Sequence, residues 1–149
     1  MDSAINTTRS DGPEPVKKSV IAITGAAGFV GRKLIDALLR REDLHIRALV
    51  RSPDHALGAH LRLNVIAGDL ARIGTSVGFL VPGCTVINLA YDRGATHAES
   101  MDTTEKLVQA CKNHRIKRLI HCSTASVYGR SLTSVLNEED ECKPRTQYG

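Results

Sequence analysis

Three glycines at fixed spacing are the residues of this sequence best suited to hold a ligand. The segment Thr24-Gly-Ala-Ala-Gly-Phe-Val-Gly31 places them directly after an apolar, β-branched run and before a helical pattern. Gly25 would permit a tight turn, Gly28 would let a diphosphate approach the backbone, and Gly31 would let the helix pack closely on the sheet. Free N–H groups at the start of that helix would face the phosphates. This context predicts dinucleotide binding, with a merely structural turn as the alternative.

An arginine after the second apolar run bears on which dinucleotide would bind. An acidic residue there would hydrogen-bond the ribose 2′-hydroxyl of NAD, whereas an arginine can accommodate the 2′-phosphate of NADP. The sequence reads Val50-Arg51-Ser52, with no acid beside the arginine, and Arg32 after the last glycine offers a second cation. The alternative is that both arginines are solvated surface residues. We interpret the pattern as favouring NADP over NAD as the cofactor.

Strand and helix patterns alternate along the chain. Buried strands are predicted at residues 19–24, 45–50, 63–67, 84–90 and 116–123. Helices are predicted from the glycine turn to about residue 41, weakly over 72–81, and over 98–114, and residues 129–147 form a long loop. Without hairpin turns, right-handed crossovers make the sheet parallel. The predicted fold class is α/β, a doubly wound parallel sheet (Rossmann) of strand order 3-2-1-4-5, incomplete at its C-terminal side because a sixth strand usually follows.

The helical periodicity also predicts which side chains face the core. The first helix carries Val30, Leu34 and Leu38 on one stripe, with Ile35 and Leu39 beside it. In the last helix, the side chains expected to face inward are Met101, Leu107, Val108 and Cys111.

Length and composition limit the chain to one domain of ordinary globular character. It has 149 residues, of which 42% are hydrophobic and 24% charged. Only 3% are aromatic and none is Trp, so we expect an aliphatic core of the kind found under parallel sheets, and no surface for stacking RNA bases. The net charge is +4, but the basic residues are dispersed, which disfavours a nucleic-acid partner.

The polar N-terminus and the scattered cysteines bear on the cellular location that we expect for the protein. We interpret residues 1–18 as a flexible tail and residues 19–149 as the domain. The tail does not resemble a signal peptide, and no stretch approaches the ~18 apolar residues of a membrane span. The four cysteines show no metal-ligand spacing, so we expect reduced thiols, no metal and a cytoplasmic location.

Four further motifs follow the glycine segment in order. They are Gly68-Asp69-Leu70, Asn88-Leu89-Ala90, Ser123-Thr-Ala-Ser-Val-Tyr-Gly129 and Pro144-Arg-Thr-Gln-Tyr148-Gly149. Over residues 19–149 the chain resembles the N-terminal part of the extended short-chain dehydrogenase/reductase family, the NAD(P)-dependent sugar epimerases and dehydratases. One departure is Tyr91, where the family often has a small residue. The resemblance implies that the cofactor contacts Gly25, Ala27, Gly28, Phe29, Val30, Arg51, Asp69, Leu70, Leu89, Ala90 and Tyr148.

The resemblance also implies catalytic residues near the end of the chain. Tyr148 would be the base that takes a hydroxyl proton, while the nicotinamide exchanges hydride. Thr124 would hydrogen-bond the substrate hydroxyl, with Ser123 and Ser126 as alternatives. A phenol ordinarily titrates near pH ~10. The family lowers this value with the charge of the nicotinamide and with a lysine four residues after the tyrosine, a position that would follow the last residue, Gly149.

Two functions follow as hypotheses. The first is the cofactor-binding part of an NAD(P)-dependent epimerase, dehydratase or reductase that acts on a sugar nucleotide or a related alcohol or carbonyl. The second is a non-catalytic dinucleotide-binding or redox-sensing module that pairs with another chain. The second rests on the apolar edge that a sheet ending at residues 116–123 would leave unpaired. The expected partners are therefore a dinucleotide, a sugar nucleotide, and a second copy or a completing chain.

Overall fold

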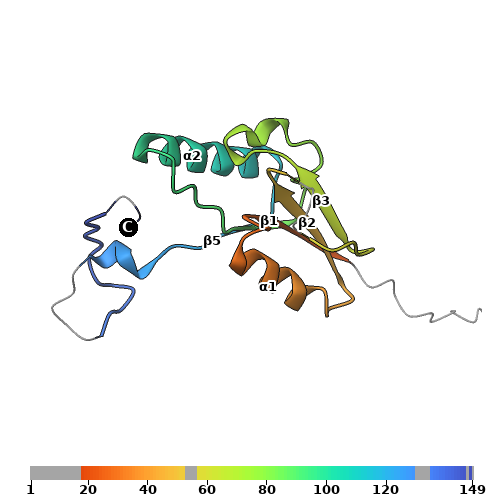
Figure 1. Cartoon of the computed structure of the whole chain (residues 1–149), viewed down its shortest axis with the longest axis horizontal. Helices are drawn as coiled ribbons and strands as arrows, with labels where there is room; N and C mark the ends of the chain where they lie inside the picture. Colours follow the sequence, from red (N-terminus) through yellow and green to blue (C-terminus); the bar gives the residue numbers. More distant parts are fainter. Residues whose placement is uncertain (1–17, 53–56, 130–134, 147, 149) are drawn as a thin grey trace, which may run out of the picture.

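A five-stranded parallel sheet forms the centre of the molecule (Figure 1). This computed structural model describes residues 18–52, 57–129, 135–146 and 148. The strand order is β3-β2-β1-β4-β5, and all four neighbouring pairs are parallel, which confirms the predicted fold class. Apart from Lys18, the predicted N-terminal tail lies outside the described residues. The strands are β1 (Ser19–Thr24), β2 (Leu44–Val50), β3 (Leu63–Ala67), β4 (Thr85–Asn88) and β5 (Arg118–His121).

Helices cover both faces of the sheet and create two cores. The helix α1 (Phe29–Leu38) lies on one face, and α2 (His97–Asn113) lies on the other with the 3-10 helix η1 (Leu70–Thr75), as Figure 1 shows. Under α1, Ile35 packs with β-branched and small side chains of β1 and β2. Under α2, Leu107 packs with side chains of β1, β2 and β4 and with Phe79. The β-branched runs thus bury both of their faces, as strands under crossover helices do.

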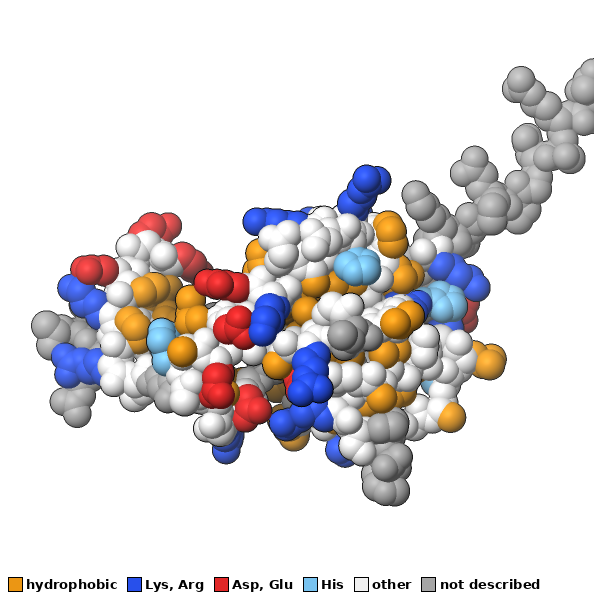
Figure 2. All heavy atoms as spheres, turned by 90° about the horizontal axis from the view of Figure 1, so that it is seen from above, with side chains coloured by type: hydrophobic (Ala, Val, Ile, Leu, Met, Phe, Trp, Pro, Cys, Tyr) orange, Lys and Arg blue, Asp and Glu red, His pale blue; other side chains and the backbone are white. Residues whose placement is uncertain are grey.

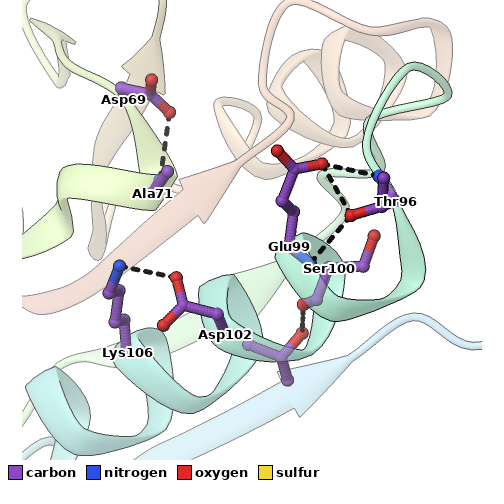
Figure 3. Close-up of polar contacts among 8 residues, drawn as sticks. Asp69, Ala71, Thr96, Glu99, Ser100, Asp102 and Lys106 are labelled. Carbon is purple, nitrogen blue, oxygen red and sulfur yellow. Dashed lines mark hydrogen bonds and ion pairs between the residues drawn. The ribbon is translucent and has the colours of Figure 1, made fainter.

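The helix α2 begins with a capping box (Figure 3). The Thr96 hydroxyl accepts a hydrogen bond from the Glu99 N–H at 3.3 Å, and the Glu99 carboxylate accepts one from the Thr96 N–H at 2.7 Å. These bonds lower the pKa of Glu99, the backbone bond contributing most. The prediction for Met101 is wrong, because its side chain is 49% exposed. The buried residues of α2 are Leu107, Ala110 and Cys111, which all lie in the C-terminal half of the helix, whereas Met101 lies in its second turn.

Several predicted boundaries also differ from the structure. The weak helix of residues 72–81 is the shorter η1, and the first helix ends at Leu38 rather than near residue 41. The strand predicted at 84–90 contains only Thr85–Asn88, and that predicted at 116–123 contains only Arg118–His121. A short 3-10 helix, η2 (Ala125–Tyr128), follows β5. The core is not wholly aliphatic, because Phe79 is its largest fully buried side chain.

Charges of both signs are mixed on the face seen in Figure 2. Acidic and basic side chains lie next to one another near the middle of this face, and Lys106 pairs with Asp102 along α2 at 2.6 Å. This face therefore lacks the continuous basic stripe of a nucleic-acid interface. Within the described residues, no helix has the length and apolar character that a membrane crossing requires.

Candidate functional site

The glycine turn packs directly against the chain that leaves β4. Gly25 has φ +65°, and a Cβ atom there would lie 2.7 Å from the Ala90 nitrogen and from the Leu89 carbonyl carbon. A Cβ at Gly31 would lie 2.6 Å from the Ala26 oxygen. Real Cβ contacts are essentially never shorter than 3.0 Å, and the atoms met here are backbone. Glycine is therefore required at both positions, and the turn, the start of α1 and the end of β4 form one close-packed unit.

The first turn of α1 is open on its outer side. Gly28 is the N-cap and contributes no side-chain hydrogen bond to the helix N–H groups. The next two side chains are exposed, Phe29 to 83% and Val30 to 57%, so the prediction that Val30 faces the core is wrong. The turn itself is closed by a hydrogen bond of 3.0 Å from the Gly28 N–H to the Gly25 oxygen. Unpaired N–H groups and the positive end of the helix dipole make this a place where a diphosphate can bind.

Two arginines flank the turn, in different electrostatic settings. The Nε of Arg32 donates a hydrogen bond of 2.8 Å to the Ala27 oxygen, which holds this guanidinium on the turn. Arg51 forms an exposed ion pair with Asp92, Nη1 to Oδ2, at 3.4 Å. No acid is next to Arg51 in sequence, but the fold brings one from the segment after β4.

The Gly68-Asp69-Leu70 motif, which the resemblance places against the adenine of the cofactor, lies at the same edge of the sheet. The Gly68 N–H donates to the Val50 oxygen at 2.9 Å, which joins the end of β3 to the end of β2, next to Arg51. Asp69 caps η1 by accepting a hydrogen bond of 3.0 Å from the Ala71 N–H (Figure 3). This bond uses Oδ1, so Oδ2 can still accept from an adenine amino group. Leu70 is half-buried against the core beneath α2.

A polar row crosses the carboxyl ends of three strands, and it is buried at Thr24 and Asn88 but exposed at His121. Thr24, Asn88 and His121 stand opposite one another in β1, β4 and β5. The Thr24 hydroxyl donates to the Asn88 Oδ1, and the Asn88 Nδ2 lies 2.9 Å from the His121 Nδ1. Since the amide nitrogen can only donate, the His121 Nδ1 is the acceptor of this bond. Sequence reasoning missed this row, although polar residues ending three apolar strands were the available signal.

The two residues assigned to catalysis are placed by different contacts. Thr124 is the N-cap of η2, where its hydroxyl accepts a hydrogen bond of 3.2 Å from the Ser126 N–H. Tyr148 packs edge-on against Tyr91, with ring centroids 4.8 Å apart. Because Tyr91 directly follows Ala90, this contact brings Tyr148 to the segment after β4. The residue that departs from the family pattern is thus the one that touches the predicted base.

Tyr128 is the tyrosine of the Ser123–Gly129 motif, and its surroundings do not suit a base. Burial raises its pKa, and negative charge from Cys142 and three nearby carboxylates raises it further. Gly129 then turns the chain with φ +68°, and a Cβ atom there would collide with the Lys143 oxygen. The chain after η2 and the chain near Lys143 therefore lie against each other, and this part of the molecule lies to one side of the sheet (Figure 1).

Within the described part of the chain, the cysteines and histidines form no alternative centre. Cys84 and Cys111 are buried, and burial raises the pKa of Cys111 to about 11, so it stays a thiol. Cys122 and Cys142 are exposed and free. Among the residues that the structure describes, no three His, Cys, Asp or Glu side chains could hold a metal ion together.

The sequence also matches those of known proteins. Residues 25–144 match a protein family described as NAD(P)H-binding. An uncharacterized UDP-glucose epimerase, YtcB of Bacillus subtilis, is 25% identical over 149 residues, which covers 87% of this chain and 47% of the relative. A 4-hydroxy-2-methyl-3-oxo-4-farnesyl-3,4-dihydroquinoline-1-oxide ketoreductase of Stigmatella aurantiaca is 34% identical over 138 residues, which covers 82% of this chain and 38% of the relative.

Solved protein structures share this fold. The crystal structure of Bordetella bronchiseptica WbmG in complex with NAD matches with a TM-score of 0.72 and 26% identity, over 89% of this chain and 46% of that one. UDP-glucuronic acid 4-epimerase from Bacillus cereus in complex with NAD matches with a TM-score of 0.65 and 26% identity, over 87% and 47%. The chain spans about half the length, or less, of the relatives that it matches.

Proposed function

The chain belongs to the NAD(P)H-binding, extended short-chain dehydrogenase/reductase family, and we propose that it is the cofactor-binding part of an oxidoreductase, epimerase or dehydratase that acts on a sugar nucleotide or a related alcohol or carbonyl. The observation that carries this proposal is the close approach at Gly25 and Gly31, which leaves the first turn of α1 open beside the end of β4. A diphosphate fits there, because it needs backbone donors and no intervening side chain.

The remaining residues extend the site in both directions from the turn. Toward β2 and β3, Asp69 would accept from the adenine amino group and Arg51 would face the adenosine ribose, which favours NADP. Leu89 and Ala90 would line the middle of the cofactor. Toward β5, Thr124 would hydrogen-bond the substrate hydroxyl and Tyr148 would take its proton. The cofactor, when bound, supplies hydride transfer at its nicotinamide ring.

A binding titration tests the proposal. NADH and NADPH fluoresce, so each can be titrated with the purified chain and with the variants Gly28→Ala and Gly74→Ala. A Cβ at position 28 has only the Gly25 oxygen near it, at 3.1 Å, so the fold survives while the methyl group stands where the diphosphate approaches. We expect the dissociation constant to rise about tenfold or more in Gly28→Ala, a loss of about 1.4 kcal/mol. Gly74 has no atom within 4 Å of its Cβ position, so its variant should bind normally. Failure of the unmodified chain to bind either dinucleotide would refute the proposal.

The second hypothesis, a non-catalytic module that pairs with another chain, is supported by the edge at β5. Among the described strands β5 pairs only with β4, and its Ile120 is 44% exposed. An apolar edge strand tends to recruit a partner. Size-exclusion chromatography with light scattering tests this: a stable monomer across a wide concentration range would contradict obligatory pairing.

A further inference from the structure

The Arg51–Asp92 ion pair bridges two strands that are not neighbours. Arg51 follows β2 and Asp92 lies four residues after β4, and the sheet order places β1 between these strands. The carboxyl end of β1 carries the glycine turn. The pair therefore joins the two sides of the candidate dinucleotide site at the edge that the cofactor would cross.

The Asp92 carboxylate is held in place without help from Arg51. Its Oδ1 accepts a hydrogen bond of 2.9 Å from the Gly94 N–H, which closes an Asx turn. The same turn includes a bond of 3.4 Å from the Ala95 N–H to the Asp92 backbone oxygen. Oδ2 is the atom that faces Arg51. The acid is thus a fixed feature of the segment after β4, and the long arginine side chain is the mobile partner.

We propose that Asp92 is a specificity-determining residue for the dinucleotide, an inference that rests on the proposed function. Its carboxylate is paired with the Arg51 guanidinium. A 2′-phosphate must displace this carboxylate in order to bind the guanidinium, whereas a 2′-hydroxyl can bind without displacing it. Asp92 also adds a negative charge near the position of that phosphate. Both effects lower the affinity for NADP relative to NAD, so the preference that Arg51 alone would give is reduced. Arg32 stays on the glycine turn without an acidic partner among the described ion pairs.

The variant Asp92→Asn isolates the charge. Asparagine keeps the oxygen that accepts from the Gly94 N–H, so the turn is retained while the ion pair is lost. Both partners are exposed, so the gain should be modest: NADP should bind about threefold to fivefold more tightly, or about 0.7–1 kcal/mol, at low salt. Binding of NAD should change by less than about twofold, since its ribose carries no 2′-charge. The difference should shrink at about 0.5 M salt, where screening is strong.

A matched control is Asp102→Asn, which removes the acid of the exposed Lys106 pair on α2 (Figure 3). It should leave both affinities unchanged. When Arg51 is already replaced by Gln, adding Asp92→Asn should raise the affinity for NADP by less than about half as much as Asp92→Asn does alone, because no guanidinium is left to be freed from the ion pair.

Two negative outcomes are distinguishable. If both dinucleotides bind but Asp92→Asn leaves the ratio of their affinities unchanged, or weakens both equally, the role of Asp92 is refuted and the proposed function stands. If neither dinucleotide binds to the unmodified chain or to any variant, the proposed function fails, and this inference fails with it.

Discussion

Replacing Gly31 by alanine tests whether the close packing of the glycine turn controls both stability and binding. The new Cβ would lie 2.6 Å from the Ala26 oxygen and 2.8 Å from the Ala26 carbonyl carbon. The Gly25 oxygen would lie closer still. Ordinary contact begins at 3.4 Å, so the helix start and the turn must separate by at least roughly 0.8 Å. Overpacking of this kind costs about 1–3 kcal/mol, and the clash with immobile backbone puts Gly31→Ala in the upper half of that range.

Two assays separate the consequences. Chemical denaturation should show a loss of about 2–3 kcal/mol in the free energy of unfolding. Titration with NADH should show at least about a tenfold rise in the dissociation constant, because the helix N–H groups move away from the phosphates. Gly74→Ala is the control, and it should be neutral or should stabilise by up to about 1 kcal/mol. An unfolding midpoint and an affinity for Gly31→Ala that equal those of the unmodified chain would refute the packing argument.

Three further expectations concern the scaffold. Arg62→Ala removes a guanidinium that donates to two backbone oxygens just after α1, and it should lower the free energy of unfolding in urea by about 1–2 kcal/mol. Arg62→Lys should restore less than half of this loss. A loss under about 0.3 kcal/mol in Arg62→Ala would contradict a stabilising role for these two bonds. The pKa of Glu99 is lowered in the folded state. Glu99 therefore stabilises the fold fully above its unfolded pKa of about 4.3, and this stabilisation is lost as the pH falls through the folded pKa. Glu99→Gln should therefore show a flatter stability curve below about pH 5, and an acid limb as steep as that of the unmodified chain would count against the capping box. Burial raises the pKa of Cys111 to about 11, so with Cys84 it should resist iodoacetamide near pH 8 while the two exposed cysteines react, as mass spectrometry can show; equal labelling of all four would disprove the burial.

The fold was predictable because its local signals agree. Apolar β-branched runs separated by helical patterns specify a parallel sheet, and the glycine segment marks the first crossover. The errors came from tertiary context. The segment 72–81 became a 3-10 turn because Asp69 caps it early and Phe79 is drawn into the core. Met101 was assigned inward because apolar character alone does not define the face of a long helix, which packing against the sheet decides.

The geometry of the candidate site was predictable where it depends on the backbone, and less so where it depends on side chains from distant segments. The requirement for glycine at positions 25 and 31 follows from a motif that is contiguous in sequence. The pairing of Arg51 with Asp92 joins residues 41 positions apart and left no pattern to find. The row through Asn88 depends on register between β1, β4 and β5, which is fixed only when the sheet assembles.

The position of β5 at the described edge of the sheet has a consequence for local stability. Its backbone is hydrogen-bonded to β4 alone, whereas β1 lies between two strands and beneath helices on both faces. Amide hydrogens of β5 should therefore exchange with solvent through local opening, while those of β1 should exchange only when the whole domain unfolds. The half of the candidate site that is proposed to hold the diphosphate is thus the rigid half, and the half that leads to Thr124 is the one that opens first.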